Sequence, residues 1–306
     1  MAGSRLFLPQ KTTGKTWLKK PDHCIQTHLS GGKENRDMKR LRGVVVLVFA
    51  LFLFSSCATM MSPAPVIQQV TTRGELVVGT AGTMPPLNMK TKDGRLVGYE
   101  LDLAKRIADS MGVKLRVETM PFSELLPALE AGKVDMVISG MTMTPERNLK
   151  VAFVGPYRIS GKSVLAKSAT LSRVDEVSEI KASDVTLTAL KGSTSQAFVE
   201  TVFPNVKLIT VSTYDEAVKL VLEDKAHAMV ADHPICITTV LRYPDKDLVA
   251  LITPFTYEPL GIAVPPNDPL LVNWLENLLE SLDGMGELQA LNDKWFKSGS
   301  WIKELP

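Results

Sequence analysis

The stretch YELDLAKRIADSMGVKLRVET, residues 99–119, decides the fold class because it predicts a helix followed at once by a strand. Apolar residues recur with the spacing of one helix face, at Leu101, Ala104, Ala108 and Met111. Gly112 is a residue type that commonly ends a helix, and KLRVET (114–119) then alternates polar and apolar residues as a half-buried strand does. This order of elements is the unit from which α/β folds are built.

The same alternation of strands and helices continues along the chain. Further strands are predicted over 76–80, 134–139, 184–192, 206–211, 227–232 and 260–266. Further helices are predicted over 123–132, 193–203, 213–226 and in the tail from about 269 to 296. Such a pattern indicates an α/β protein with two mostly parallel sheets, each flanked by helices.

The charge of the chain is unevenly distributed. The formal net charge of the 306 residues is +2, but residues 1–57 hold ten Lys and Arg against three Asp and Glu. Residues 58–306 therefore carry 25 basic and 30 acidic residues, about −5. A mildly acidic body without a basic stripe argues against nucleic acid as a partner.

The basic excess belongs to a leader, residues 1–57, in which an extension (1–37) precedes a second methionine. MKRLRG (38–43) and the apolar run VVVLVFALFLF (44–54) have the order of a signal peptide, and the run is too short to span a bilayer comfortably. The following SSC, ending at Cys57, resembles the cleavage box of bacterial lipoproteins, with Phe54 where leucine is usual. The resemblance implies that Cys57 is lipidated and anchors the protein to a membrane. A plain signal peptide cut nearby is the alternative.

Residues 58–72 are small, contain proline and show no period, so they predict a tether. Beyond it the chain holds a single cysteine, Cys236, and can form no internal disulfide. Cys236 lies in the apolar pattern HPICITTVL, which favours a buried inert thiol over a nucleophile.

Polar residues gather where predicted strands end, as in SGMTMTPER (139–147), KGSTSQ (191–196) and MVADH (229–233). In open parallel sheets this is the edge at which ligands bind. No nucleophile elbow, phosphate loop or metal-ligand spacing is present, so the sequence predicts neither an enzyme nor a cofactor or metal. One cation, Arg147, one anion, Asp232, and several hydroxyls suit a small zwitterion.

A family resemblance becomes specific at GYELDLAKRIADSM (98–111), which is similar to the signature of bacterial extracellular solute-binding proteins of the polar amino-acid branch. Other segments match in order over about residues 73–297: LLPALEAGKVDMVISGMTMTPER, VAFVGPY, KGSTSQ, DKAHAMVAD, EPLGIAVP and GELQALNDKWF. The resemblance implies a two-lobed periplasmic-binding-protein clamshell. Lobe 1 would comprise 73–162 and 259–306, lobe 2 would comprise 163–258, and strands near KSVLAK and PLGIAV would form the hinge.

The same resemblance implies a role for residues of the first lobe. Arg147 falls where the family's arginine pairs bidentately with the ligand α-carboxylate, which its planar fork suits. Thr142 would assist with its hydroxyl, and Ser139 and Gly140 lie where backbone groups face the ligand. Phe122 would cover the ligand side chain, or else belong to the core.

From the second lobe, Thr194 and neighbouring amides of the segment that includes Ser193 would hold the carboxylate, and Asp232 would take the α-ammonium. Considered one at a time, Arg147 could be a surface residue and Asp232 a helix cap. Side-chain choice would depend on Ala81, which stands where binders of basic amino acids have an aspartate, and on Met84 and Leu87. The missing acid favours a neutral or apolar amino acid, because an unpaired buried cation is costly.

The implied function is capture of an amino acid by hinge closure and delivery to an ABC permease in the inner membrane, from the periplasm or cell envelope. An enzyme is the alternative, because the family resembles periplasmic cyclohexadienyl dehydratases. In those enzymes a glutamate three residues after the equivalent of Asp232 is the proton donor. Ile235 occupies that place here and cannot transfer a proton.

Overall fold

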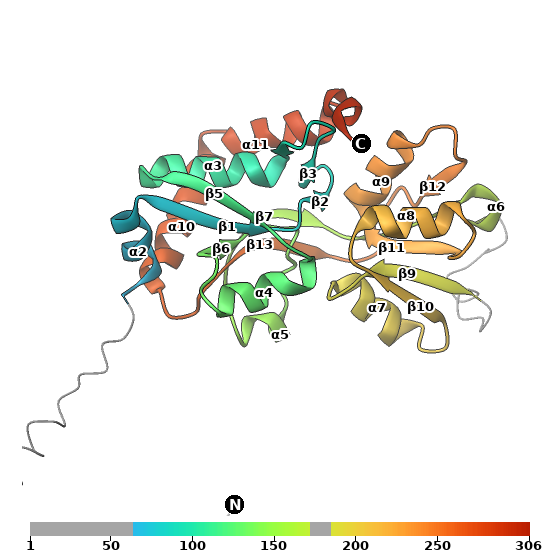
Figure 1. Ribbon diagram of the computed structural model, residues 1–306, viewed down its shortest axis with the longest axis horizontal. Coiled ribbons are helices and arrows are strands. Elements are labelled where there is room, and N and C mark those ends of the chain that lie inside the picture. Colours follow the sequence, from blue (N-terminus) through green and yellow to red (C-terminus); the bar gives the residue numbers. More distant parts are fainter. Residues whose placement is uncertain (1–63, 172–184) are drawn as a thin grey trace, which may run out of the picture. The chain divides into compact units, whose positions relative to one another are not determined.

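The computed structural model describes residues 64–171 and 185–306, and Figure 1 shows the arrangement of these parts. The extension, the signal peptide and the lipidation site at Cys57 lie outside the described residues. Within the described ranges no helix is both long and apolar enough to cross a membrane.

The first sheet has five strands in the order β5-β1-β6-β13-β7. Its strands are β1 (Glu75–Thr80), β5 (Lys114–Thr119), β6 (Met136–Val137), β7 (Ala152–Ser160) and β13 (Glu258–Val264). β5, β1 and β6 are parallel, whereas β13 runs antiparallel to both β6 and β7. The sheet is therefore mixed, with its parallel part where the sequence predicted it.

The second sheet repeats this plan in the order β10-β9-β11-β8-β12. Its strands are β8 (Lys162–Lys167), β9 (Thr186–Leu190), β10 (Lys207–Val211), β11 (Ala228–Asp232) and β12 (Leu248–Ala250). β10, β9 and β11 are parallel, and β8 is antiparallel to β11 and β12. The α/β clamshell architecture with two sheet-containing lobes is confirmed.

Helices flank both sheets. They are α2 (Val66–Arg73), α3 (Tyr99–Met111), α4 (Phe122–Glu130), α5 (Pro145–Asn148), α6 (Ser168–Leu171), α7 (Thr194–Val202), α8 (Tyr214–Leu222), α9 (His233–Arg242), α10 (Pro269–Gly284) and α11 (Glu287–Asn292), followed by the short π-helix η2 (Asp293–Lys297) and the short 3-10 helix η3 (Ser300–Glu304). In Figure 1, α3 and α4 lie on opposite sides of the first sheet, as α8 and α7 do around the second. A small antiparallel sheet, β2 (Thr83–Met84), β3 (Asn88–Lys90) and β4 (Leu96–Val97), was not predicted.

The second half of the predicted tether is folded. Residues Val66–Arg73 form helix α2, in which Val70 is fully buried. The amide of Ile67 donates to Asp268 Oδ2 at 2.8 Å, and Asp268 also caps α10 by accepting from the Leu271 amide at 3.0 Å. A single buried carboxylate thus satisfies the N-terminal amides of two helices, which fixes α2 to the body. Residues 58–63 of the tether lie outside the described residues.

The chain passes between the two sheets twice within the described residues. One crossing joins β7 to β8 at Gly161, and the other is the segment 251–257 between β12 and β13. The crossings are hydrogen-bonded to each other, since Phe255 N donates to Lys162 O at 3.0 Å and Lys162 N donates to Thr256 Oγ1 at 2.8 Å. A Cβ at position 161 would lie 2.3 Å from the carbonyl oxygen of Thr256, so only glycine permits this close approach.

Candidate ligand-binding site

The turn after β6 is built from groups that the sequence assigned to the ligand. Ser139 is fully buried, and its Oγ accepts from the Ala81 amide at 2.9 Å. The Gly140 amide donates to Glu100 Oε1 at 2.6 Å, and its φ of +57° places it in the left-handed region. A Cβ there would lie 2.6 Å from Met84 Cε. The Ser139 hydroxyl and the Gly140 amide therefore hold the turn together, which leaves their carbonyl groups for the predicted role.

Glu100 supports this turn from below, and the sequence analysis had assigned it only to the first turn of α3. Its carboxylate accepts from Gly140 N, from the Tyr157 hydroxyl and from Asn88 Nδ2 at 2.5 Å. Complete burial raises the pKa of Glu100, while these three hydrogen bonds act in the opposite direction. The first of the two acidic residues in the GYELDLA segment is thus a structural acceptor.

Arg147 reaches back over the turn that precedes it. Thr144 caps α5 by accepting from the Arg147 amide at 3.3 Å. The guanidinium donates from Nη1 to Thr142 O at 2.8 Å and from Nη2 to Gly192 O at 3.1 Å, and it lies 5.7 Å from the centre of the Phe122 ring. Burial lowers the pKa of Arg147, and the nearby charges of Asp232 and Glu258 oppose this shift. No carboxylate pairs directly with this guanidinium among the described residues, so its charge is available to an anion.

Hydroxyl groups from the two sheets meet beside Arg147. Thr142 and Thr194 lie with their Oγ1 atoms 3.4 Å apart, and Thr194 Oγ1 donates to Glu258 Oε2 at 3.1 Å. Ser193 caps α7 by accepting from the Gln196 amide at 3.1 Å, and its own hydroxyl donates to Leu190 O at 2.7 Å. Ser193 therefore positions Thr194 at the helix start, and its hydroxyl is already occupied.

Asp232 ends β11 and is directly opposite Lys162 in the antiparallel pairing with β8. Lys162 Nζ lies 2.6 Å from Asp232 Oδ1 and 3.4 Å from Glu258 Oε2. The side chain of Lys162 is 1% exposed, and that of Asp232 is 5% exposed. Asp232 occupies the N-cap position of α9, but its side chain makes no capping hydrogen bond and pairs with Lys162 instead.

Four of the predicted residues thus lie in one network of contacts. Two residues that the sequence analysis missed connect them. Arg147, Thr142, Thr194 and Asp232 are linked by contacts through Glu258 and Lys162. One signal could have revealed the two missed residues, because both stand at the ends of the predicted hinge strands, where the chain crosses between lobes. Their roles toward a ligand, like those of the predicted residues, are inferences from this geometry.

The residues predicted to set the choice of ligand side chain are apolar and buried. Ala81, Met84 and Leu87 are buried, and Met84 and Leu87 contact the turn at Gly140. Phe122, at the start of α4, is 5% exposed and packs in the core beneath Arg147. Phe122 is therefore a core residue that supports the arginine, and its role over the ligand side chain stays a prediction.

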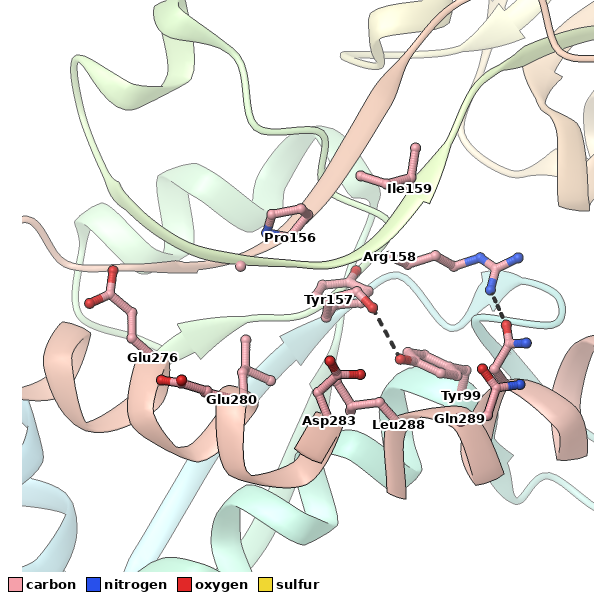
Figure 2. A pocket seen from close by; sticks show the side chains of 13 residues that line it. Tyr99, Pro156, Tyr157, Arg158, Ile159, Glu276, Glu280, Asp283, Leu288 and Gln289 are labelled. Atoms are coloured by element: carbon pink, nitrogen blue, oxygen red, sulfur yellow. Dashed lines mark hydrogen bonds between the residues drawn. The ribbon is translucent and has the colours of Figure 1, made fainter. Parts of the chain in front are cut away.

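A cavity of about 570 Å³ lies elsewhere, between β7 and the helices α10 and α11. Figure 2 shows Arg158 on one side of it and the carboxylates of Glu276, Glu280 and Asp283 on the other. Arg158 stacks 3.4 Å from the centre of the Phe296 ring and donates to Asn292. None of the predicted ligand-binding residues lines this cavity, so it is separate from the candidate site.

Fold and site together define a solute-binding protein, in which two lobes each contribute part of one polar site. Residues 76–298 match the model of the bacterial extracellular solute-binding proteins, family 3, and the chain belongs to this family. Family membership places the protein outside the cytoplasm.

The chain is 27% identical over 233 residues to the L-cystine-binding protein TcyJ of Escherichia coli K12, a match covering 75% of this chain and 85% of that one. A structure of a putative ABC transporter binding component from Wolinella succinogenes, complexed with lysine, has 37% identity and a TM-score of 0.72, covering 76% of this chain and 99% of that chain. The ancestral amino acid-binding protein AncCDT-1, described as a precursor of cyclohexadienyl dehydratase, has 34% identity and a TM-score of 0.70, covering 75% and 99%. These relatives are binding proteins, in line with a chain that is not an enzyme.

Proposed function

We propose that this protein binds a free amino acid with a neutral side chain and delivers it to an ABC importer. The observation that carries the proposal is a site lined by hydroxyl groups, with an unpaired positive charge at one end and an excess of negative charge at the other. Among the described residues the Arg147 guanidinium donates hydrogen bonds only to main-chain carbonyl groups, which leaves its charge free to bind a carboxylate. At the other end Asp232 and Glu258 outnumber Lys162, which leaves negative charge for an ammonium group.

Closure of the two lobes on the ligand is the proposed mechanism. Arg147 and Thr142 follow a strand of the first sheet, whereas Thr194 and Asp232 belong to elements of the second. A zwitterion can contact all four only when the lobes approach each other, so its binding energy favours the closed form. The hydrogen-bonded crossings at Gly161 and Thr256 are the proposed hinge. The lobe boundaries at 162/163 and 258/259 fall at these crossings and are part of the proposal.

The preference for a neutral side chain rests on the apolar residues expected to face that side chain and on the balance of charges in the site. Ala81, Met84 and Leu87 offer no acid to a cationic side chain. Arg147 and Lys162 balance Asp232 and Glu258, so the site has no net formal charge and matches a ligand with none. Lipidation of Cys57 would anchor the binding protein beside its permease in the cell envelope, and this part of the proposal depends on the sequence alone.

The test is a thermal-shift screen of the twenty amino acids on the purified protein. A ligand at 100 times its dissociation constant should stabilise the fold by about 2.7 kcal/mol. Arg147→Ala should abolish the shift, whereas Arg95→Ala should not, because Arg95 is an exposed arginine paired with Asp93 and Glu304. Unchanged binding by the Arg147 variant would remove the carboxylate clamp from the proposal.

The dehydratase alternative predicts turnover of prephenate. Ile235, at the place of the proton donor in those enzymes, is fully buried within α9. An alkyl side chain there can neither donate nor accept a proton. We therefore expect no release of phenylpyruvate from prephenate, which its ultraviolet absorbance would report. If the purified protein itself turned over prephenate, the enzymatic function would replace the transport proposal.

A further inference from the structure

Lys162 is a buried cation inside a site whose ligand would bring a cation of its own. It is the first residue of β8, at one of the crossings between the sheets, and its side chain is 1% exposed. Removing an ammonium group from water is costly unless it is paired, and Lys162 meets this need with two carboxylates at 2.6 and 3.4 Å. The lysine is therefore a fixed internal counter-ion of Asp232 and Glu258.

The contacts within the protein leave one negative charge uncancelled at this end of the site. Lys162 occupies Oδ1 of Asp232, and Oδ2 receives no hydrogen bond from the described residues. Both Glu258 oxygens accept from hydroxyls, Oε2 from Thr194 at 3.1 Å and Oε1 from Thr256 at 3.3 Å. Hydroxyl donors carry no charge, so two carboxylates and one ammonium leave a single negative charge. Glu100, another buried acid, is engaged by three donors under the Gly140 turn.

We infer that Lys162 determines ligand selectivity by cancelling one of two carboxylates, so that the site accepts one ligand cation and excludes amino acids with a second. This inference rests on the proposed function and adds the residue that sets the ligand charge. The α-ammonium would use the remaining charge of the Asp232–Glu258 pair. A lysine or arginine side chain would bring a second positive charge to a site that already contains Lys162 and Arg147.

The inference makes Glu258 the counterpart of Lys162. Glu258 begins β13 at the other crossing, so the two residues that set the charge count both lie where the lobes are joined. If Lys162 acts through charge, removal of the lysine should create a place for a second ligand cation. Removal of the lysine together with the glutamate charge should take that place away again. If Lys162 acts only by filling space, the second change should have no such effect.

The experiment measures dissociation constants of glutamine, leucine, arginine and lysine by titration calorimetry on three proteins. These are the parent, Lys162→Met, and Lys162→Met combined with Glu258→Gln. We expect the parent to prefer the neutral amino acids. Lys162→Met should shift the affinity ratio toward arginine or lysine by at least about 10-fold, which corresponds to about 1.4 kcal/mol. The double variant should restore the parent preference. Lys162→Gln, which keeps a neutral donor for Asp232, carries the test if the Met variant does not melt cooperatively.

Three results would overturn the inference. One is an unchanged ratio in a folded Lys162 variant, another is an equal gain for arginine in the single and double variants, and the third is tight binding of arginine or lysine by the parent. In each of these cases amino-acid capture itself is still observed, and the third result also removes the neutral side chain from the proposed function. Failure of the proposed function is a different result, in which the parent binds none of the amino acids while it melts as a folded protein.

Discussion

The two ends of the candidate site solve the problem of a partly buried charge in opposite ways. At one end Arg147 is bound by the neutral carbonyl oxygens of Thr142 and Gly192, and its positive charge is not cancelled. At the other end Asp232 is paired with Lys162 at 2.6 Å, and both side chains are almost fully buried. The first arrangement holds a charge ready for a ligand, whereas the second makes a charge part of the fold. Substitutions at the first end should therefore affect binding, and those at the second should first affect stability.

The largest expected effect is on folding at the Asp232 end. Asp232→Asn leaves Lys162 with Glu258 alone, at 3.4 Å, and loss of one partner of a buried ion pair costs about 3–5 kcal/mol. For a protein of this size the melting temperature should fall by about 10 °C. Calorimetric melting of the ligand-free protein measures this.

The matched control replaces both partners with apolar residues. Lys162→Met combined with Asp232→Leu removes the charges together and should recover most of the lost stability. If Asp232→Asn melts within about 2 °C of the parent, the pair is not part of the fold and the contrast between the two ends is wrong.

At the Arg147 end a conservative change should reduce affinity and leave the fold intact. Arg147→Lys keeps the positive charge but loses the planar fork that matches a carboxylate. We expect the dissociation constant of the best ligand to rise about 10- to 100-fold, because at least one charge-assisted hydrogen bond is lost. Titration calorimetry measures the affinity, and Arg95→Lys on the surface serves as the control. A melting temperature that falls as far as in Asp232→Asn would mean that Arg147 is a structural residue instead.

The sequence predicted the repeating part of the fold well. Strands β1, β5, β6, β9, β10 and β11 and helices α3, α4, α7 and α8 follow from local periodicity, because each helix buries one face and each strand is bounded by turn residues. The antiparallel strands β8 and β12 and the small sheet β2–β4 do not follow from such patterns, and neither does the antiparallel direction of β13, which the sequence predicted as a strand over 260–266. Their pairing joins residues far apart in the chain, as in Lys162 opposite Asp232, and no local spacing records it.

The candidate site divides in the same way. Arg147, Thr142 and Thr194 could be proposed from sequence because turns after strands carry recognisable polar residues. Lys162 was missed because a lysine at the start of a strand is ordinarily exposed, and its burial depends on Asp232 and Glu258, which come much later in the chain. Its place at the end of a predicted hinge strand is the one signal that singles it out. The internal use of the Ser139 hydroxyl and Gly140 amide also depends on distant partners, Ala81 and Glu100.

Glu100 gives the Arg147 end a pH dependence. Burial raises the pKa of Glu100 above 4.5, its ordinary value, so the folded protein retains a proton that the unfolded chain has released. The free energy of unfolding should therefore decrease as the pH rises from about 4.5 toward the folded pKa, with a slope of at most about 1.4 kcal/mol per pH unit. Glu100→Gln removes this titration and should flatten the slope in urea unfolding measured across that range. A parent that becomes more stable with pH in this window, to the same extent as the variant, would contradict the assignment.

The smallest expected effect is the absence of a reaction, and it tests whether the Lys162–Asp232 pair is a permanent part of the fold. Cys236 lies one turn into α9 after Asp232, is fully buried, and has a pKa raised by burial to about 12. Both burial and the nearly absent thiolate should prevent its modification at pH 8. In a protein with Cys24→Ser and Cys57→Ser, a thiol-reactive chromogenic disulfide should not react with the folded chain and should react fully in denaturant. If the folded protein reacts within minutes, this end opens locally, and the buried Lys162–Asp232 pair cannot be the permanent part of the fold that the contrast with Arg147 requires.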